Sequence, residues 1–340
     1  MGGTVATAPQ VKWGLSILHE FLCYLFHRRA SLIMINDAHC HFFSARFFET
    51  LGLQITPHQS GDPAVSIPES LGWDPPGRAE TLADRWVAEL DRHGVTRAAI
   101  MASVPGDEAS VSAAVHRHPD RFVGMTMLDP TVAGATARVK RNLEANALRC
   151  VCLFPAMHGY ELTHEAVEPV FSSAAEAGGA VFIHCGVLTV GVRRKLRLAT
   201  HVNVRAGDPL ALTSLASQYP SVPVVIPHFG AGFLRESLMA ADLCPNIYLD
   251  TSSSNSWLKY HPGLTLTQVF QQAIETLGPE RLLFGTDSSF FPRGWQRTVL
   301  ETQLSILDAL EITPKARHAI LADNFDRIFG AAVDRSTHTS

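Results

Sequence analysis

Short apolar runs alternate with amphipathic segments along most of the chain. Eight of the runs have the length and composition of buried strands, and most are continuously apolar, as parallel strands covered on both faces are. These predicted strands are 34–38, 97–101, 122–127, 150–154, 180–184, 223–227, 247–250 and 282–285. Apolar residues recur with helical spacing in the segments that follow them. The predicted helices are 81–93, 107–117, 132–146, 165–177, 209–218, 233–241, 266–277 and 296–310.

Eight strands that alternate with eight helices predict an α/β protein with the (β/α)8 fold, the TIM barrel. Some helix ends carry clear signals. Gly94 follows the first helix at a position that favours glycine, and Thr313-Pro314 predicts the start of an extra C-terminal helix that ends near Ala322. We therefore expect one barrel domain at 34–330, followed by a short tail at 331–340.

An N-terminal extension of 33 residues precedes the first predicted strand. Its apolar run lies within 11–29 and is interrupted by His19 and Glu20, so it is shorter than the roughly 20 apolar residues that span a membrane. Basic residues follow the run in place of a small-residue cleavage site, and a signal peptide is not expected. The extension is either a loosely docked amphipathic helix or an upstream, non-native start, because Met34 directly precedes the first strand.

Three predicted connections are long for this fold: 43–80, 185–208 and 251–265. Long loops in a compact domain are usually functional. Each of these follows a predicted strand, and in a barrel the loops that follow strands form the mouth in which active sites are built. The pattern therefore places the candidate site at that end of the barrel.

Five residues that can bind a metal or transfer a proton follow predicted strands. His39 and His41 come after the first strand, His184 ends the fifth, His228 follows the sixth and Asp287 follows the eighth. The carboxyl ends of barrel strands share one rim, so these side chains are expected to lie together. One such histidine is more often an ordinary polar residue than a ligand, but the joint occurrence favours a metal site over five separate structural roles.

The spacing of His39 and His41 adds to this expectation. Residues i and i+2 of an extended chain point to the same side, so both imidazoles can reach one ion while Cys40 points away. His116 and His118 have the same spacing, but they end a predicted helix, where such residues diverge by about 200°. We expect that second pair to be a solvated helix terminus.

Two or three imidazoles and one carboxylate suit Zn²⁺ or a similar divalent ion. With an open position for water, such an ion lowers the pKa of the water to about 7. Asp287 could bind the ion and also accept a proton. His228 could polarise a carbonyl or transfer a proton beside it.

The order of these motifs resembles the amidohydrolase superfamily, and more narrowly the amidohydrolase-related group that includes aminocarboxymuconate-semialdehyde decarboxylase. The resemblance spans about 34–330 and lies in NDAHCHFF, VFIHCG, VIPHFGAG, IYLDTSS, LLFGTDSSF and DNFDRIFG. It implies that His39, His41, His184 and Asp287 bind the metal and that His228 is catalytic. Binuclear members carry a carboxylated lysine at the end of strand 4, where this chain has CVCLFP. The resemblance therefore implies one divalent ion per chain, with zinc expected.

Three functions remain open at this point. The first is a hydrolase that acts on a small carboxylate-bearing substrate through metal-activated water. The second is a metal-dependent decarboxylase that protonates a substrate carbon before CO2 leaves. The third is a barrel that binds a metal without catalysis, although structural zinc is usually cysteine-rich and does not need a barrel mouth.

Candidate substrate contacts come from the predicted mouth loops. Arg46, Arg235 and Arg293 could hold a carboxylate, because a guanidinium binds carboxylates in bidentate fashion. Trp257 could line an aromatic pocket. The loop after strand 5 carries a run of basic residues between 193 and 205, which fits a solvated face or a subunit contact at least as well as a substrate site.

The charge and cysteine content of the chain limit the classes of partner that we expect it to bind. Charged residues make up 18% of the 340 residues and the net charge is −4, which gives no electrostatic footprint for nucleic acid or for an anionic membrane. The six cysteines include no CxxC pair and fit reduced, buried thiols of a cytoplasmic protein. A small-molecule substrate is the expected partner, and a homodimer is one expectation for the assembly.

Overall fold

The computed structural model describes residues 2, 34–55, 61–145, 147–253 and 255–330. The expectations for the N-terminal extension, apart from Gly2, and for the C-terminal tail lie outside these residues. Within them, no helix is long and apolar enough to cross a membrane.

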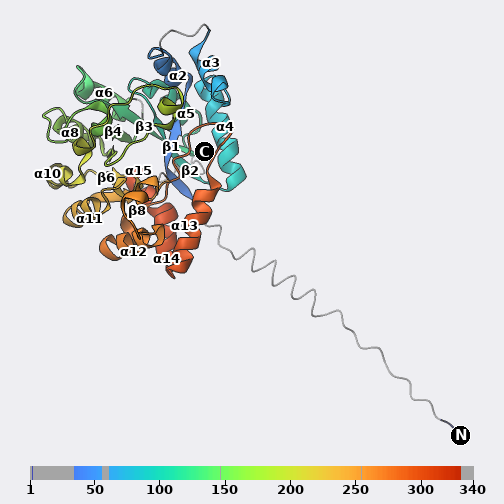
Figure 1. The fold of residues 1–340 in the computed structure, drawn as a ribbon, viewed down its shortest axis with the longest axis vertical. Coiled ribbons are helices and arrows are strands. Elements are labelled where there is room, and N and C mark those ends of the chain that lie inside the picture. Colours follow the sequence, from blue (N-terminus) through green and yellow to red (C-terminus); the bar gives the residue numbers. More distant parts are fainter. Residues whose placement is uncertain (1, 3–33, 56–60, 146, 254, 331–340) are drawn as a thin grey trace, which may run out of the picture. The chain divides into compact units, whose positions relative to one another are not determined.

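Eight parallel strands form one sheet whose neighbours follow the order of the sequence, from β1 to β8. The strands are β1 Asn36–Phe42, β2 Arg97–Ala102, β3 Phe122–Leu128, β4 Cys150–Leu153, β5 Ala180–Ile183, β6 Val224–Ile226, β7 Ile247–Asp250 and β8 Leu282–Leu283. Helices alternate with these strands and surround them (Figure 1). The chain is thus a (β/α)8 barrel, and the fold predicted from the apolar pattern is confirmed.

Each predicted helix has a counterpart between or after the strands. The helices are α4 Ala79–His93, α5 Glu108–Arg117, α6 Ala135–Glu144, α8 Glu168–Ala177, α10 Thr213–Gln218, α11 Leu234–Leu243, α12 Leu266–Leu277 and α13 Arg297–Ala309. Gly94 ends α4 in the left-handed conformation, as its position predicted. The segment predicted as a helix from 209 begins instead with a 3-10 turn, η2 Pro209–Leu212.

The extra C-terminal helix is longer than predicted. Thr313 caps α14 Pro314–His318 with its side chain, but the helical path continues through the π-turn η6 Ala319–Asp323 into α15 Asn324–Phe329. The predicted end near Ala322 was wrong, because no helix breaker occurs before Gly330 and the buried side chains of this segment pack against the barrel.

The first strand is also longer than predicted, which matters for the site. The prediction ended it at residue 38, but β1 continues to Phe42 and pairs His41 with Met101 of β2. His39 and His41 therefore lie within the strand rather than after it. Polar side chains can continue a buried strand at this end because they face the barrel mouth, where their nitrogen atoms find partners.

The three long connections contain structure of their own. The loop after β1 holds α2 Ala45–Gly52 and α3 Pro63–Ser70, the loop after β5 holds α9 Gly191–Lys195 and η1 Val204–Gly207, and the loop after β7 holds η4 Asn255–Tyr260. A short helix, α7 Pro155–His158, follows β4. Residues of α2, α7, α9 and η4 line the mouth of the barrel.

Backbone hydrogen bonds join β1 to the segment after β8 and close the barrel. The amide of Ala38 donates to the Phe284 carbonyl at 2.9 Å, that of Asp287 to the His39 carbonyl at 2.8 Å, and that of His41 to the Ser288 carbonyl at 2.7 Å. The same closure therefore brings the first-strand histidines next to Asp287.

Buried apolar side chains fill both sides of the sheet. One group, which includes Met101, Met125 and Phe182, fills the barrel interior, and a larger group packs between the strands and the outer helices. Cys40, Cys150, Cys152, Cys185 and Cys244 are buried and form no disulfide, as predicted for reduced thiols. Cys23 lies outside the described residues.

The second HxH pair behaves as a helix terminus. His116 lies in the last turn of α5 and its Nδ1 donates to the Ser112 carbonyl at 2.7 Å. His118 follows the helix and pairs with the Asp84 carboxylate at 2.7 Å. The two imidazoles have separate partners, which confirms the contrast with the pair in β1.

Gly285 should be required for the close packing of β7, β8 and β1. A Cβ at this position would lie 2.7 Å from Oδ1 of Asp250 and 3.0 Å from the Cβ of His39. Gly285→Ala should lower the free energy of unfolding by about 1–3 kcal/mol, the usual cost of overpacking. Gly191→Ala is the control, because nothing lies within 4 Å of its added methyl group. Equal unfolding curves for both variants in urea would contradict this account.

Candidate metal centre

The five residues singled out in the sequence line one cavity of about 440 Å³. His39 and His41 lie on β1, His184 follows β5, His228 begins the turn η3 His228–Gly230 after β6, and Asp287 follows β8. His39 and His41 lie in the second half of β1, and the other three follow their strands, so all five share the mouth of the barrel.

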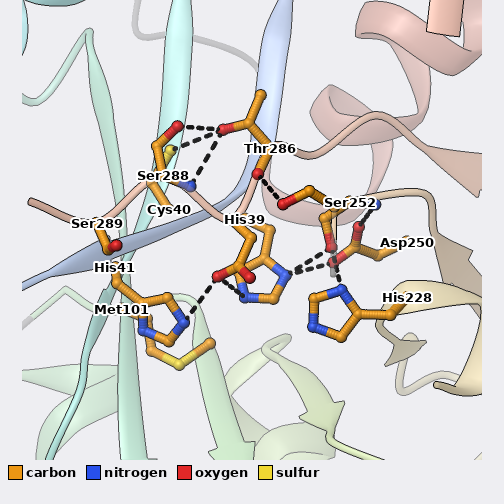
Figure 2. A network of polar contacts seen from close by, with 12 residues as sticks. His39, Cys40, His41, Met101, His228, Asp250, Ser252, Thr286, Ser288 and Ser289 are labelled. Carbon is orange, nitrogen blue, oxygen red and sulfur yellow. Dashed lines mark hydrogen bonds and ion pairs between the residues drawn. The ribbon is translucent and has the colours of Figure 1, made fainter. Parts of the chain in front are cut away.

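Asp250 at the end of β7 holds His39. The imidazole of His39 is buried, and its Nδ1 lies 2.7 Å from Oδ2 of Asp250 and 3.1 Å from Oγ of Ser252. Figure 2 shows the His39 ring between the rings of His41 and His228, with Asp250 and Ser252 beside it. Since a carboxylate only accepts, Nδ1 carries a proton, and the other nitrogen, Nε2, lies 3.9 Å from Oδ1 of Asp287.

Burial would by itself lower the pKa of His39, but the carboxylates of Asp250, Asp287 and Asp37 together outweigh it and raise this pKa to about 9. In the absence of a metal ion, Nε2 of His39 is therefore protonated and its N–H faces Asp287. Metal ligands must be deprotonated to bind, so an arriving cation would take the place of that proton.

Ser103 holds His41 in the same way. The hydroxyl of Ser103 donates to the Met101 carbonyl at 3.1 Å and lies 2.8 Å from Nδ1 of His41. Because its single proton is committed, the hydroxyl accepts from Nδ1–H of His41. The Nε2 atom of His41 is then directed at Asp287, 3.2 Å from Oδ1.

The Nε2 atoms of His39 and His41 both approach the same carboxylate oxygen of Asp287, Oδ1. Its backbone has φ of 60°, an uncommon conformation for a residue other than glycine, and hydrogen bonds from Arg293 and Gln296 to its carbonyl hold it there. Burial raises the pKa of Asp287, but the hydrogen bond from His41 and the charges of the two β1 histidines bring this pKa well below its ordinary value. The carboxylate is ionised throughout the physiological range.

His184 and His228 supply neutral imidazoles on the other side of the site. Burial lowers the pKa of His184 well below its ordinary value, and His228 and His39 lower it further. Burial, and after it His39, also lower the pKa of His228. Their ring centroids lie 5.4 Å apart.

Nδ1 of His184 is buried and has no hydrogen-bond partner among the described residues, whereas Nδ1 of His228 lies 2.9 Å from Ser252 Oγ. An unpartnered nitrogen of this kind is a group that a bound cation or a water molecule would satisfy.

These residues fit a divalent cation. One ligand atom each from His39, His41 and Asp287 lies within 4.8 Å of the others, and His184 lines the same cavity. Imidazole and carboxylate ligands are those that zinc and similar ions take at catalytic sites. The Nδ1 protons of the two β1 histidines are held by other groups, which directs both Nε2 atoms to one point, an arrangement typical of metal-binding histidines.

The predicted substrate contacts fall into two groups. Arg293 and Trp257 line the cavity. Arg46 and Arg235 are not among its lining residues: they are exposed, with Arg46 3.4 Å from the Glu49 carboxylate and Arg235 2.5 Å from that of Glu236. Arg46 lies on α2 and Arg235 in the first turn of α11, and a sequence pattern cannot show which way a long side chain points on a helix surface.

Sequence reasoning missed the aromatic wall of the cavity and the residues that hold the histidines. Phe43 stacks on Phe47 at 4.1 Å, and Trp73 stacks on Phe290 at 3.8 Å. All four rings line the cavity, and Lys195 joins them from the basic run after β5, with its Nζ 5.7 Å from the Trp73 ring.

A signal for Asp250 existed in the sequence. It is an acidic residue at the carboxyl end of an apolar strand, on the rim that carries the histidines. Ser103 and Ser252 gave no comparable signal, because serine is common in loops and its partners are set by the fold.

Three comparisons relate this chain to known proteins. A segment of 91 residues is 31% identical to protein fluG of Emericella nidulans, but it covers 27% of this chain and 10% of that protein. This chain therefore spans only a small part of the curated relative that it matches.

Two solved structures share the fold over nearly their whole length. One is a probable 2-pyrone-4,6-dicarboxylic acid hydrolase from Acinetobacter baumannii with citric acid bound, which has a TM-score of 0.55 and 16% identity and covers 87% of this chain and 99% of its own. The other is a 5-carboxyvanillate decarboxylase from Novosphingobium aromaticivorans complexed with manganese and 4-hydroxy-3-methoxy-5-nitrobenzoic acid. It has a TM-score of 0.59 and 16% identity, with 88% and 97% covered.

The family model for amidohydrolases matches residues 36–331, which include every residue of the candidate metal centre. Because this match extends over most of the chain, the protein belongs to the amidohydrolase family.

Proposed function

We propose that this amidohydrolase-family protein is a metal-dependent hydrolase of a small, carboxylate-bearing substrate. One zinc ion would be bound by His39, His41, His184 and Asp287, with His228 beside it. The observation that carries the proposal is the convergence of two imidazole Nε2 atoms on one oxygen of Asp287 inside a cavity. Once bound, a divalent cation there would polarise a substrate carbonyl and make water more acidic.

The protein's own groups have separate tasks in this proposal. The carboxylate of Asp287 is ionised, and in this proposal it binds the ion and takes the proton that water gives up. His228 is a neutral imidazole on the same cavity and can interact with a substrate oxygen. Asp250 and Ser103 keep the β1 histidines in the orientation that directs Nε2 to the site.

The cavity supports a planar, anionic substrate. Its stacked aromatic rings offer flat apolar faces, and Lys195 and Arg293 bring positive charge to its lining. Arg293 lies over the Phe290 ring, with its guanidinium carbon 4.5 Å from the centroid. The two structural neighbours are named for acids of this kind, a pyrone dicarboxylate and a carboxylated vanillate.

The aromatic wall also favours a second candidate, the decarboxylation of an aromatic acid. Both reactions would use the same ligands, and the named neighbours include a hydrolase and a decarboxylase. A barrel that binds a metal without catalysis is a weaker candidate, because the ligand atoms face a cavity with room for a small molecule.

Several expectations beyond the site stay predictions. These are a cytoplasmic location, a homodimeric assembly and the lack of nucleic-acid or membrane partners. The five described cysteines are compatible with a reducing compartment, since all are unpaired thiols.

The protein should bind one divalent ion per chain. Elemental analysis of purified protein should give a ratio near one for zinc, or for manganese after exchange, and chelation should abolish turnover until either ion is restored. Asp287→Ala should lose the ion, because it removes the group on which both Nε2 atoms converge. Two ions per active chain, or full occupancy in Asp287→Ala, would show that the ligand set is wrong.

His228→Ala should keep the metal and lose turnover. Four other groups already supply the ligands, and a fifth would fill the position that a catalytic ion leaves open. Loss of an acid–base or polarising imidazole typically lowers kcat by 10²–10⁴-fold. Metal content, melting temperature and rate should be measured on one preparation. Loss of the ion from this variant, or turnover at the wild-type rate, would refute the assigned role.

A single substrate screen separates the two reactions. Lactones and amides of planar carboxylic acids should be opened with uptake of water and without CO2, as followed by mass spectrometry. Aromatic and unsaturated acids should release no CO2 above the rate of the metal-free protein. Metal-dependent CO2 release from any of these acids, with no hydrolysis of the lactones, would replace the hydrolase proposal by the decarboxylase.

A further inference from the structure

Four buried polar groups form a continuous chain beside the candidate metal centre. Oδ2 of Asp250 lies 2.7 Å from Nδ1 of His39, that nitrogen lies 3.1 Å from Oγ of Ser252, and Oγ lies 2.9 Å from Nδ1 of His228. Asp250 and Ser252 have no exposed surface, and the two histidines are at most 4% exposed. Figure 2 shows Ser252 between the two rings. Every proton in this chain must therefore be shared among its own members or with the adjacent backbone.

The direction of each hydrogen bond follows from the number of protons available. The Asp250 carboxylate accepts, so Nδ1 of His39 carries a proton, and Ser252 Oγ can only accept from that nitrogen. The one proton of the Ser252 hydroxyl is then left for Nδ1 of His228, the other group within hydrogen-bond distance. A neutral imidazole that accepts at Nδ1 carries its proton on Nε2.

We infer that Ser252 is a positioning residue that holds His228 with its proton on Nε2. His228 lines the cavity, and its Nε2 lies across the ring from the nitrogen that Ser252 holds. His228 thus presents an N–H donor to the cavity. This inference rests on the proposed function for its consequence: the site would bind a substrate through a carbonyl or carboxylate oxygen at His228, and His228 would not be the base that activates water.

The backbone around Ser252 keeps its conformation without the Ser252 hydroxyl. Its amide donates to Oδ1 of Asp250 at 2.5 Å, so the turn from β7 is held without the hydroxyl. Gly285 leaves room for this turn, because a Cβ there would lie 3.1 Å from the Cβ of Ser252. Ser252→Ala therefore removes the link to His228 while the turn and the Asp250–His39 contact stay in place.

The inference is tested by the proton positions on His228. Zinc-loaded protein labelled with ¹⁵N-histidine would be studied by long-range ¹H–¹⁵N NMR at neutral pH, with the His228 signals identified by their loss in His228→Gln. We expect a protonated Nε2 and an unprotonated Nδ1 in the wild type, and a mixture of the two tautomers in Ser252→Ala. Turnover of Ser252→Ala should fall about 10–100-fold, the usual effect of losing a group that orients a site histidine, with unchanged zinc content.

Ser173→Ala is the matched control. Ser173 is also buried, but its hydroxyl donates to the Pro169 carbonyl within α8, so its removal should leave the His228 spectrum unchanged. Asp250→Ala should instead weaken zinc binding about 10–100-fold, because it frees the ring of His39.

Two results would overturn the inference. The first is a wild-type protein whose His228 carries its proton on Nδ1, since the Ser253 backbone is a second hydrogen-bond partner beside this ring. The second is a Ser252→Ala spectrum identical to that of the wild type. Both are read from the tautomer itself, on zinc-loaded or metal-free protein. They are therefore independent of whether any substrate is hydrolysed, and a failure of the proposed function would be seen separately.

Discussion

The contact of two imidazoles with one carboxylate oxygen is the interaction on which the site depends. His39 and His41 approach Oδ1 of Asp287 at 3.9 and 3.2 Å, and this is possible only because the barrel closes between β1 and the segment after β8. The hydrogen bonds of that closure fix the backbone of all three residues. Asp250 and Ser103 then fix the rings from behind. Fold stability and ligand geometry are thus supplied by the same contacts, which gives a pre-organised place for a cation.

The fold could be predicted almost completely from the sequence, because a buried parallel strand has to be apolar on both faces. The wrong predictions were the ends of two elements whose length is set by tertiary contacts. β1 continues past Ala38 because its histidines find partners at the mouth, and the helix after Thr313 continues to Phe329 because its apolar side chains pack against the barrel. The intrinsic strand and helix propensities of these residues do not show that either element continues.

The sequence predicted those site residues whose position follows from their place at the end of a strand. The five predicted residues that follow or end strands all line one cavity, but Arg46 and Arg235 point to neighbouring glutamates instead. A long side chain on a mouth helix has many rotamers, and its partner is chosen by tertiary packing. Ser252 and Ser103 were beyond prediction for the same reason, since their roles come from neighbours distant in sequence, such as His228 and His41.

The position of the metal ion is the central claim, and anomalous diffraction at the zinc absorption edge from crystals of the zinc-loaded protein would test it most directly. The account predicts one strong peak per chain at bonding distance, about 2.0–2.2 Å, from Nε2 of His39, Nε2 of His41 and a carboxylate oxygen of Asp287, with His184 as the fourth ligand. A second peak in the cavity, or an ion that does not contact the two β1 histidines, would contradict it.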